Sequence, residues 1–127
     1  MDKKGIGNFG EKIAENYLRN KGYQILDKNF VFRMPGNPQK GEIDIVTKKG
    51  DIISFVEVKT LKRKEGFLPE DKVNFSKRKK LRVAAERWLM KNKIPLDSKW
   101  QIDVISVEIG QNKKIKIDHF ENAIGYE

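Results

Sequence analysis

Apolar residues recur at helical spacing in two stretches of the chain. Between Asn8 and Lys21 they are Phe9, Ile13, Ala14, Tyr17 and Leu18, and between Lys77 and Asn92 they are Leu81, Ala84, Ala85, Trp88 and Leu89. Residues three and four apart lie on one face of a helix, so both stretches predict amphipathic helices. Gly22 follows the first helix as a C′ stop, and Ser76 precedes the second as an N-cap.

Runs rich in isoleucine, valine and aromatic residues, bounded by glycine, proline or polar residues, predict five strands. They span Tyr23–Phe32, Glu42–Thr47, Ile52–Thr60, Trp100–Ile109 and Lys114–Asp118, with a break in the first around Asp27–Asn29 and a tail from His119 onward. The resulting order is α-β-β-β-α-β-β. This order predicts a single α/β domain over residues 1–127, in which helices flank one mixed central sheet.

The second and third predicted strands form a hairpin around Gly50, and its two faces differ in character. Because side chains alternate along a strand, the first face carries Glu42, Asp44, Val46, Ile53, Phe55, Glu57 and Lys59. The opposite face is apolar and carries Ile43, Ile45, Ile52, Val56 and Val58. The charged residues of both strands therefore lie on the same face.

The register of this hairpin decides which acids meet. With Lys49-Gly50 at the centre of the turn, Asp44 pairs with Phe55 and Glu42 pairs with Glu57. A slip of two residues would instead pair Asp44 with Glu57 and would keep all the charges on one face. A slip of one residue would turn the apolar face toward water, which burial disfavours.

Carboxylates crowded at such short range either bind protons or need a cation. Lys59 offsets one negative charge, and a hard divalent cation with oxygen ligands, Mg²⁺ or Mn²⁺, would offset the rest. The alternative is a solvent-facing strand end with ordinary surface charges. Phe55 and Ile53 on the same face favour a cleft, because they predict that a helix covers the neighbouring half of it.

A further acid, Glu11, lies at the border of the apolar stripe of the first helix and can reach toward this cleft. Its alternative role is that of a favourable acidic residue in a first helical turn. Three other residues are expected to have structural and not chemical roles. His119 is expected to make a local hydrogen bond, Trp88 to lie in the core, and Asp103 to support either the sheet or Lys59.

The charge of the chain favours polyanionic partners. Lysine and arginine number 27 against 18 acidic residues, which gives a formal net charge of +9. Nucleic acid is the first candidate partner and an anionic membrane the second. The alternative is that the excess of lysine only keeps the protein soluble. The absence of cysteine excludes thiol nucleophiles, disulfides and cysteine zinc sites. With no apolar run long enough for a membrane span or a signal peptide, we expect a cytoplasmic protein.

Basic residues cluster in two places near the predicted cleft. One cluster directly follows the third strand and the other begins the second helix; they consist of Lys62, Arg63 and Lys64, and of Lys77, Arg78, Lys79 and Lys80. Cations at a helix N-terminus oppose the helix dipole, so a plain solvated face is less favourable there. We expect both clusters to contact nucleic-acid phosphates.

These residues resemble a known pattern. Asp44 followed by Glu57-Val58-Lys59 resembles the PD-(D/E)XK signature of restriction-endonuclease-like nucleases, with Ile43 in place of the proline. The segments "GNFGEKIAENYLRNKGYQILDKNF", "GEIDIV", "FVEVKT", "GFLPEDKVNFSKRKKL" and "HFENAI" are similar to the YraN-like bacterial family of endonuclease-like proteins over nearly the whole chain. Archaeal Holliday-junction resolvases are similar in the same core. Gln101 stands where relatives tend to have arginine.

The resemblance implies a restriction-endonuclease-like fold and a metal-dependent nuclease that hydrolyses phosphodiester bonds in DNA, including branched or damaged DNA. It implies that Asp44, Glu57 and the Val58 carbonyl are metal ligands, together with Glu42 from the matching segment. Lys59 would position or deprotonate the attacking water, and Glu11 would correspond to the N-terminal acid of the resolvases. Two other interpretations stay open, a non-catalytic nucleic-acid-binding module and a protein–protein adaptor. Pairing of two copies as a homodimer also stays open.

Overall fold

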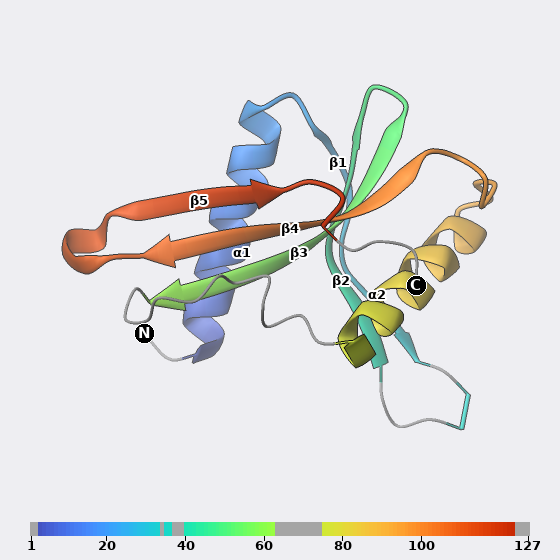
Figure 1. The fold of residues 1–127 in the computed structure, drawn as a ribbon, viewed down its shortest axis with the longest axis horizontal. Helices are drawn as coiled ribbons and strands as arrows, with labels where there is room; N and C mark the ends of the chain where they lie inside the picture. Colours follow the sequence, from blue (N-terminus) through green and yellow to red (C-terminus); the bar gives the residue numbers. More distant parts are fainter. Residues whose placement is uncertain (1–2, 34, 37–39, 63–74, 124–127) are drawn as a thin grey trace.

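The computed structural model of the chain describes residues 3–33, 35–36, 40–62 and 75–123. These residues form a five-stranded sheet in the order β1-β2-β3-β4-β5, with two α-helices (Figure 1). In chain order the elements are α1 (Lys3–Asn20), β1 (Gln24–Arg33), β2 (Lys40–Lys49), β3 (Ile52–Lys62), α2 (Phe75–Lys91), β4 (Trp100–Ile109), the 3₁₀ turn η2 (Gln111–Lys113) and β5 (Ile115–Phe120). Neighbouring strands are antiparallel except for the parallel pair β3 and β4. The predicted α/β class, with one mixed sheet flanked by helices, is confirmed.

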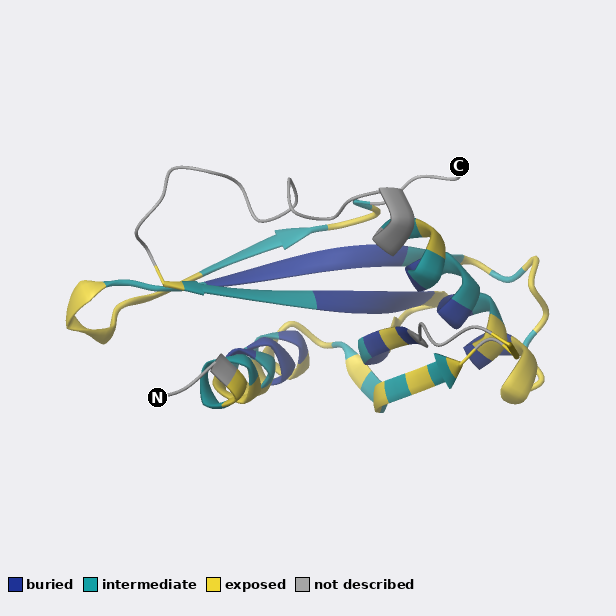
Figure 2. Ribbon diagram, turned by 90° about the horizontal axis from the view of Figure 1, so that it is seen from below, coloured by how far each residue is buried: buried dark blue, intermediate teal, exposed yellow. Residues whose placement is uncertain are grey.

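The two helices cover opposite faces of the sheet, and Figure 2 shows α1 below the strands with its buried side turned toward them. Ala14 and Leu18 of α1 pack in one cluster with Ile45, Val56, Ile105 and Val107. The buried residues of α2 belong to a second cluster with Ile43, Val46, Ile53, Phe55, Ile102 and Val104. The central strands are therefore buried on both faces, which explains why β3 and β4 carry few exposed residues. Within the described part of the chain, no helix has the length and hydrophobicity that spanning a membrane requires.

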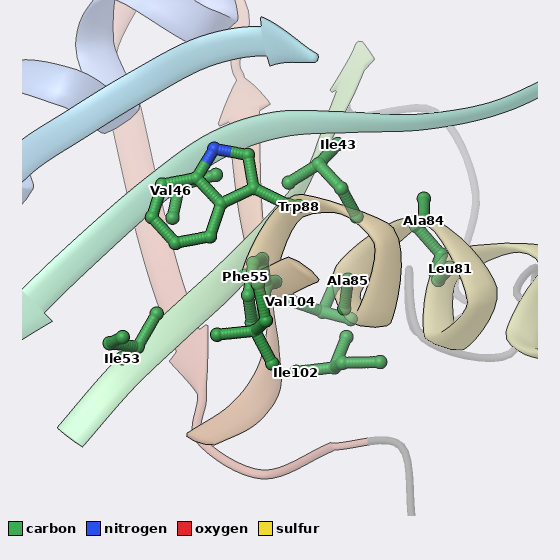
Figure 3. Close-up of a cluster of buried hydrophobic side chains, with 11 residues drawn as sticks. Ile43, Val46, Ile53, Phe55, Leu81, Ala84, Ala85, Trp88, Ile102 and Val104 are labelled. Carbon is green, nitrogen blue, oxygen red and sulfur yellow. The ribbon is translucent and has the colours of Figure 1, made fainter. Parts of the chain in front are cut away.

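Aromatic rings form the centre of the cluster under α2. Trp88 reaches from α2 toward Val46 and Phe55, as Figure 3 shows. The centroids of the Phe55 and Trp88 rings lie 5.6 Å apart at 76°, an edge-to-face contact. The indole nitrogen of Trp88 donates to Oδ2 of Asp27 at 2.9 Å, so its polar atom is satisfied. The prediction that Trp88 lies in the core is confirmed.

The first helix ends as its sequence predicts. Gly22 adopts φ of 91°, a left-handed conformation that favours glycine. The amide of Gly22 donates to the carbonyl of Arg19, and the amide of Tyr23 donates to the carbonyl of Leu18. This pair of hydrogen bonds is the Schellman arrangement, which satisfies carbonyls that the helix end would otherwise leave unpaired.

Three local predictions are wrong. The hairpin turn is centred on Gly50-Asp51, because Lys49 pairs with Ile52. The register of β2 against β3 therefore differs by two residues from the register with Lys49-Gly50 at the centre of the turn. When this register is continued along both strands, Asp44 lies level with Glu57. The glycine with φ of 61° takes the first central turn position, which suits a type II′ turn. Helix α2 already includes Ser76, which is therefore not its N-cap. His119 belongs to β5 instead of a tail, because it pairs with Ile105.

The regular alternation predicted for β2 is broken at Asp44. Ile43 packs in the α2 cluster, whereas Ile45 packs in the α1 cluster, although a regular strand would turn both to one face. On the neighbouring strand Asn29, with φ of 54°, lies between the pairs Lys28–Ile45 and Phe30–Ile43. This left-handed residue sits level with Asp44 and accounts for the irregularity, because it interrupts the regular pleat of the paired strands.

Candidate active site

The predicted acids line one cavity, where β2 and β3 separate beside the first turns of α1. The pairing of β2 with β3 ends at Ile45 and Val56, one residue before Asp44 and Glu57. The cavity has a volume of about 520 Å³. It is lined by Ile6, Gly7, Glu11, Glu42, Asp44, Glu57, Val58, Lys59, Thr60, Leu61 and Lys62. All six residues that the resemblance singled out, Glu11, Glu42, Asp44, Glu57, Val58 and Lys59, are thus brought together.

Two contacts orient the central residues. The amide of Val58 donates a hydrogen bond of 2.8 Å to Oδ2 of Asp44, so the Asp44 side chain bridges the gap between the separating strands. The ammonium of Lys59 lies 3.2 Å from Oε1 of Glu57, and these side chains are only 19% and 8% exposed. Glu57 and Lys59 therefore lie on β3 itself, and Asp44 of β2 is anchored to β3 by a hydrogen bond.

The acids raise one another's proton affinity. Burial first, and then the charge of Glu57, raise the pKa of Asp44 to about 8, against the opposing effect of the Val58 amide. Burial also raises the pKa of Glu11, with the charges of Glu42 and Glu57 adding to the rise. Without a bound cation, burial and the neighbouring carboxylates thus favour the protonated form of Asp44.

Glycines next to two of the acids let the helices approach the strands closely. A Cβ atom on Gly10 would overlap the Thr60 side chain, so α1 packs tightly on β3 directly beside Glu11. A Cβ atom on Gly41 would lie 2.9 Å from the Lys80 carbonyl oxygen of α2. Sequence reasoning missed this role, although a signal was available, because each glycine directly precedes an acid of the cavity.

An ion-pair group one turn beyond Glu11 ties α1 to β1. The buried carboxylate of Glu15 accepts from Lys28 Nζ at 3.1 Å and from Arg19 Nε at 3.1 Å. These partners, the Lys28 hydrogen bond foremost, hold the pKa of Glu15 below its usual range. Because Glu11 and Glu15 lie one helical turn apart, the same contact fixes the position of Glu11. Sequence reasoning did not identify Glu15 or Lys28.

A separate hydrogen-bonded network joins α1 to β4 and β5. His119 Nε2 lies 2.8 Å from Oδ2 of the fully buried Asp103, and its Nδ1 lies 3.2 Å from the Tyr17 hydroxyl. Gln101 Nε2 and the Asn122 amide donate to the other Asp103 oxygen, each at 2.9 Å. His119 makes hydrogen bonds, as expected, but its partners lie far from it along the chain and are not local. Asp103 supports the sheet.

The donor atoms in the cavity suit a hard cation. Within the described residues, only Asp103, His119 and Glu121 place three candidate ligand atoms within 4.8 Å of one another, so no three carboxylates of the cavity converge that tightly. Asp44, Glu57 and Val58, the three residues that the resemblance implies as ligands, all line the cavity. Oxygen donors of this kind fit Mg²⁺ or Mn²⁺, because hard cations prefer oxygen ligands.

The predicted basic residues lie partly outside the described part of the chain. Arg63 and Lys64 lie outside the described residues, as does the side chain of Lys77. Lys62 is exposed at the cavity rim, and Lys79 is exposed on the first turns of α2, where Arg78 and Lys80 are half-buried. The structure thus brings Lys62 to the cavity.

Comparison with known proteins identifies the family. The profile of the uncharacterised protein family UPF0102 matches residues 10–107. The chain belongs to the UPF0102 family. A UPF0102 protein of Alkaliphilus oremlandii is 43% identical over 125 residues, covering 97% of this chain and 99% of the relative. A UPF0102 protein of Clostridioides difficile is 39% identical over 123 residues, covering 97% and 99%.

A third UPF0102 relative, from Clostridium tetani, is 47% identical over 91 residues, which cover 72% of this chain and 70% of the relative. The match of the UPF0102 profile begins at Gly10 and ends at Val107, so it spans every acid of the cavity together with Lys59. The expected membership of the YraN-like family is confirmed.

Proposed function

We propose that this UPF0102 protein is a metal-dependent nuclease that hydrolyses phosphodiester bonds in DNA. One observation carries the proposal. Asp44, Glu57 and Lys59 line a single cavity with two further acids, at a point where the sheet opens and the side chains of Glu57 and Lys59 are largely shielded from water. A surface patch of ordinary charges would not need such burial, because buried carboxylates cost free energy unless a partner compensates them.

The proposed metal would be held by Asp44, Glu57 and the Val58 carbonyl, with Glu42 as a further oxygen donor. When bound, it would supply Lewis-acid stabilisation of the phosphate and a lower pKa for a coordinated water. The raised pKa of Asp44 supports this role, because the crowded carboxylates that favour a proton would equally favour a bound divalent cation.

The remaining chemistry comes from side chains of the chain itself. The Lys59 ammonium, set beside the Glu57 carboxylate, can orient a water molecule for attack and stabilise negative charge that develops on the phosphate. Glu11 and Glu42 enter the cavity from α1 and β2, and either carboxylate can accept the proton that the water releases. Phe55 and Val56, which directly precede Glu57 in β3, are fully buried, and their packing holds this part of the strand in place.

DNA is the proposed substrate because the chain is strongly basic and an exposed lysine lies at the cavity. Lys62 lies on the rim itself, and the whole chain carries a formal charge of +9. Acids in the cavity repel phosphates, so lysines outside it must provide the binding free energy. Such contacts are independent of sequence, which fits cleavage directed by DNA shape.

The decisive experiment is a cleavage assay with Mg²⁺ or Mn²⁺ on linear, nicked, flapped and four-way DNA. We expect Asp44→Asn to lower the rate of cleavage by about 10³-fold or more, and Lys59→Ala to lower it by about 10²-fold. Asp51→Asn and Lys48→Ala are matched controls, because both residues are exposed at the hairpin turn, away from the cavity. Neither control should change the rate.

The outcomes separate the candidate functions. Cleavage that survives both cavity substitutions would come from a contaminating enzyme and would refute the proposal. Tight DNA binding without cleavage of any substrate would instead favour a non-catalytic binding module on the same scaffold.

A further inference from the structure

The turn between β4 and β5 forms a basic projection that no sequence motif singled out. Lys113, Lys114 and Lys116 are exposed there, within a stretch of six residues that begins at Gln111. Figure 2 shows this turn fully exposed at one end of the sheet, away from both helices. The lysines therefore do not cover apolar surface of a neighbouring helix.

Most of these cations lack an acidic partner. Lys116 lies 3.8 Å from Asp118, an exposed ion pair. Among the described residues, no carboxylate forms an ion pair with Lys113, Lys114 or the nearby Lys62. Their positive charge is thus available to a ligand, whereas a lysine within an ion pair would have to give up its partner first.

The conformation of the turn is well defined. The amide of Gly110 donates to the Lys114 carbonyl at 2.8 Å and closes the turn. Asn112 and Lys113 adopt left-handed φ values of 63° and 59°, which turn the chain sharply between the two strands. A short, closed turn presents its lysines at a constant position, so less conformational entropy is lost when they bind.

The sheet places this turn beside the candidate active site. Parallel pairing of β3 with β4 extends to Lys62 and Ile109, so the turn begins one strand away from the cavity rim, and Figure 1 shows β3 ending next to it. Along β3 the five residue steps from Glu57 to Lys62 correspond to about 17 Å, or about five base-pair steps of a duplex.

We propose that the β4–β5 turn is a second binding surface, which contacts the phosphate backbone of the nucleic acid more than about five base pairs from the bond to be cleaved, because the turn lies beyond Lys62. Lys113 and Lys114 make the contacts, and Lys62 at the cavity lies between them and the acids. The inference rests on the proposed function, because the carboxylates of the cavity define the position from which the distance is counted.

The test measures binding of a duplex of about 20 base pairs by fluorescence anisotropy, in EDTA so that no cleavage occurs. The double variant Lys113→Gln/Lys114→Gln should raise Kd about tenfold near 0.1 M salt and reduce the slope of log K against log salt by about 2. The matched control Lys48→Gln/Lys93→Gln removes the same charge from exposed positions elsewhere and also includes one left-handed lysine, Lys93 with φ of 57°. The control should leave the slope nearly unchanged.

A second variant and a second readout keep the outcomes distinct. Lys113→Arg/Lys114→Arg should bind like wild type, because it keeps the charge and the turn. In cleavage assays the glutamine variant should raise KM and leave kcat unchanged. Equal losses in the glutamine variant and its control would overturn the proposal and leave the proposed nuclease standing. A wild-type protein that binds DNA through this turn without cleaving it would overturn the nuclease alone, and one that neither binds nor cleaves would overturn both.

Discussion

Removing the charge of Asp44 should stabilise the metal-free protein, even though it abolishes the proposed activity. The carboxyl has an ordinary pKa of 3.8, and its surroundings raise this pKa to about 8. A pKa raised by folding means that stability is greatest below the ordinary pKa and is lost as the pH rises toward the folded value. At pH 7 the protein must take up a proton or tolerate a buried charge, and either costs free energy.

The magnitude follows from the distance between pH 7 and the ordinary pKa. About 3.2 pH units, at about 1.36 kcal/mol for each, give a cost of at most about 4 kcal/mol. An asparagine side chain at this position would keep an oxygen that can accept the Val58 amide, so the substitution removes the charge and preserves the hydrogen bond of 2.8 Å. Allowing for the amide group that must find its own partners, we expect Asp44→Asn to raise stability by about 1–3 kcal/mol at pH 8.

The assay is thermal or urea unfolding in EDTA between pH 4 and pH 8. The advantage of Asp44→Asn should be small at pH 4, grow with pH, and reach a Tm increase of about 3–10 °C at pH 8. Addition of Mg²⁺ should stabilise wild type by about 2.7 kcal/mol when its concentration is 100 times Kd, and should leave the variant unchanged. Asp51→Asn at the exposed hairpin turn is the control and should give no such gain. If Asp44→Asn unfolds more easily than wild type at pH 8 in EDTA, the argument that the carboxylates repel one another is refuted.

Three further substitutions test how α1 is held over the site. Gly10→Ala should lower the free energy of unfolding by about 1–3 kcal/mol and reduce cleavage, because its methyl group would overlap the Thr60 side chain. The control Gly7→Ala should keep or slightly raise stability, because its Cβ atom would meet nothing within 4 Å. Equal Tm values for the two variants would contradict the close approach of α1 to β3 at Gly10. His119→Gln should lower the free energy of unfolding by about 2 kcal/mol in urea titrations, because the fully buried Asp103 loses a hydrogen-bond partner. An unchanged midpoint of the urea unfolding curve would show that the hydrogen bonds around Asp103 contribute little to stability. Glu15→Gln should destabilise the protein at neutral pH, because the ion pair lowers the pKa of Glu15. The stability from a lowered pKa is fully present above the unfolded pKa of 4.5 and is lost as the pH falls from there toward the folded pKa, so the deficit relative to wild type should shrink below pH 4.5. A deficit independent of pH would rule out the ion pair as its source.

The candidate site was accessible to sequence reasoning because its residues lie on neighbouring strands. Strand alternation places Glu57 and Lys59 on one face, and either of the two hairpin registers that bury the apolar residues predicts Asp44 on that same face. The supporting contacts are different. Tyr17 and His119 are 102 residues apart in the chain, and no periodic pattern connects positions so distant.

The amino-acid sequence alone determined the two helices, the strands and the set of acids that could meet. It also limited the hairpin to two registers that differ by two residues. These features follow from the backbone period of each element and from the need to bury apolar side chains, and both act over short stretches of chain. Only the tertiary structure decided that the turn is centred on Gly50-Asp51, that the pleat breaks at Asp44, and that the end of β3 lies beside the β4–β5 turn. Those outcomes depend on how two helices and five strands pack together, and the free energy of that packing is shared among residues far apart in the chain.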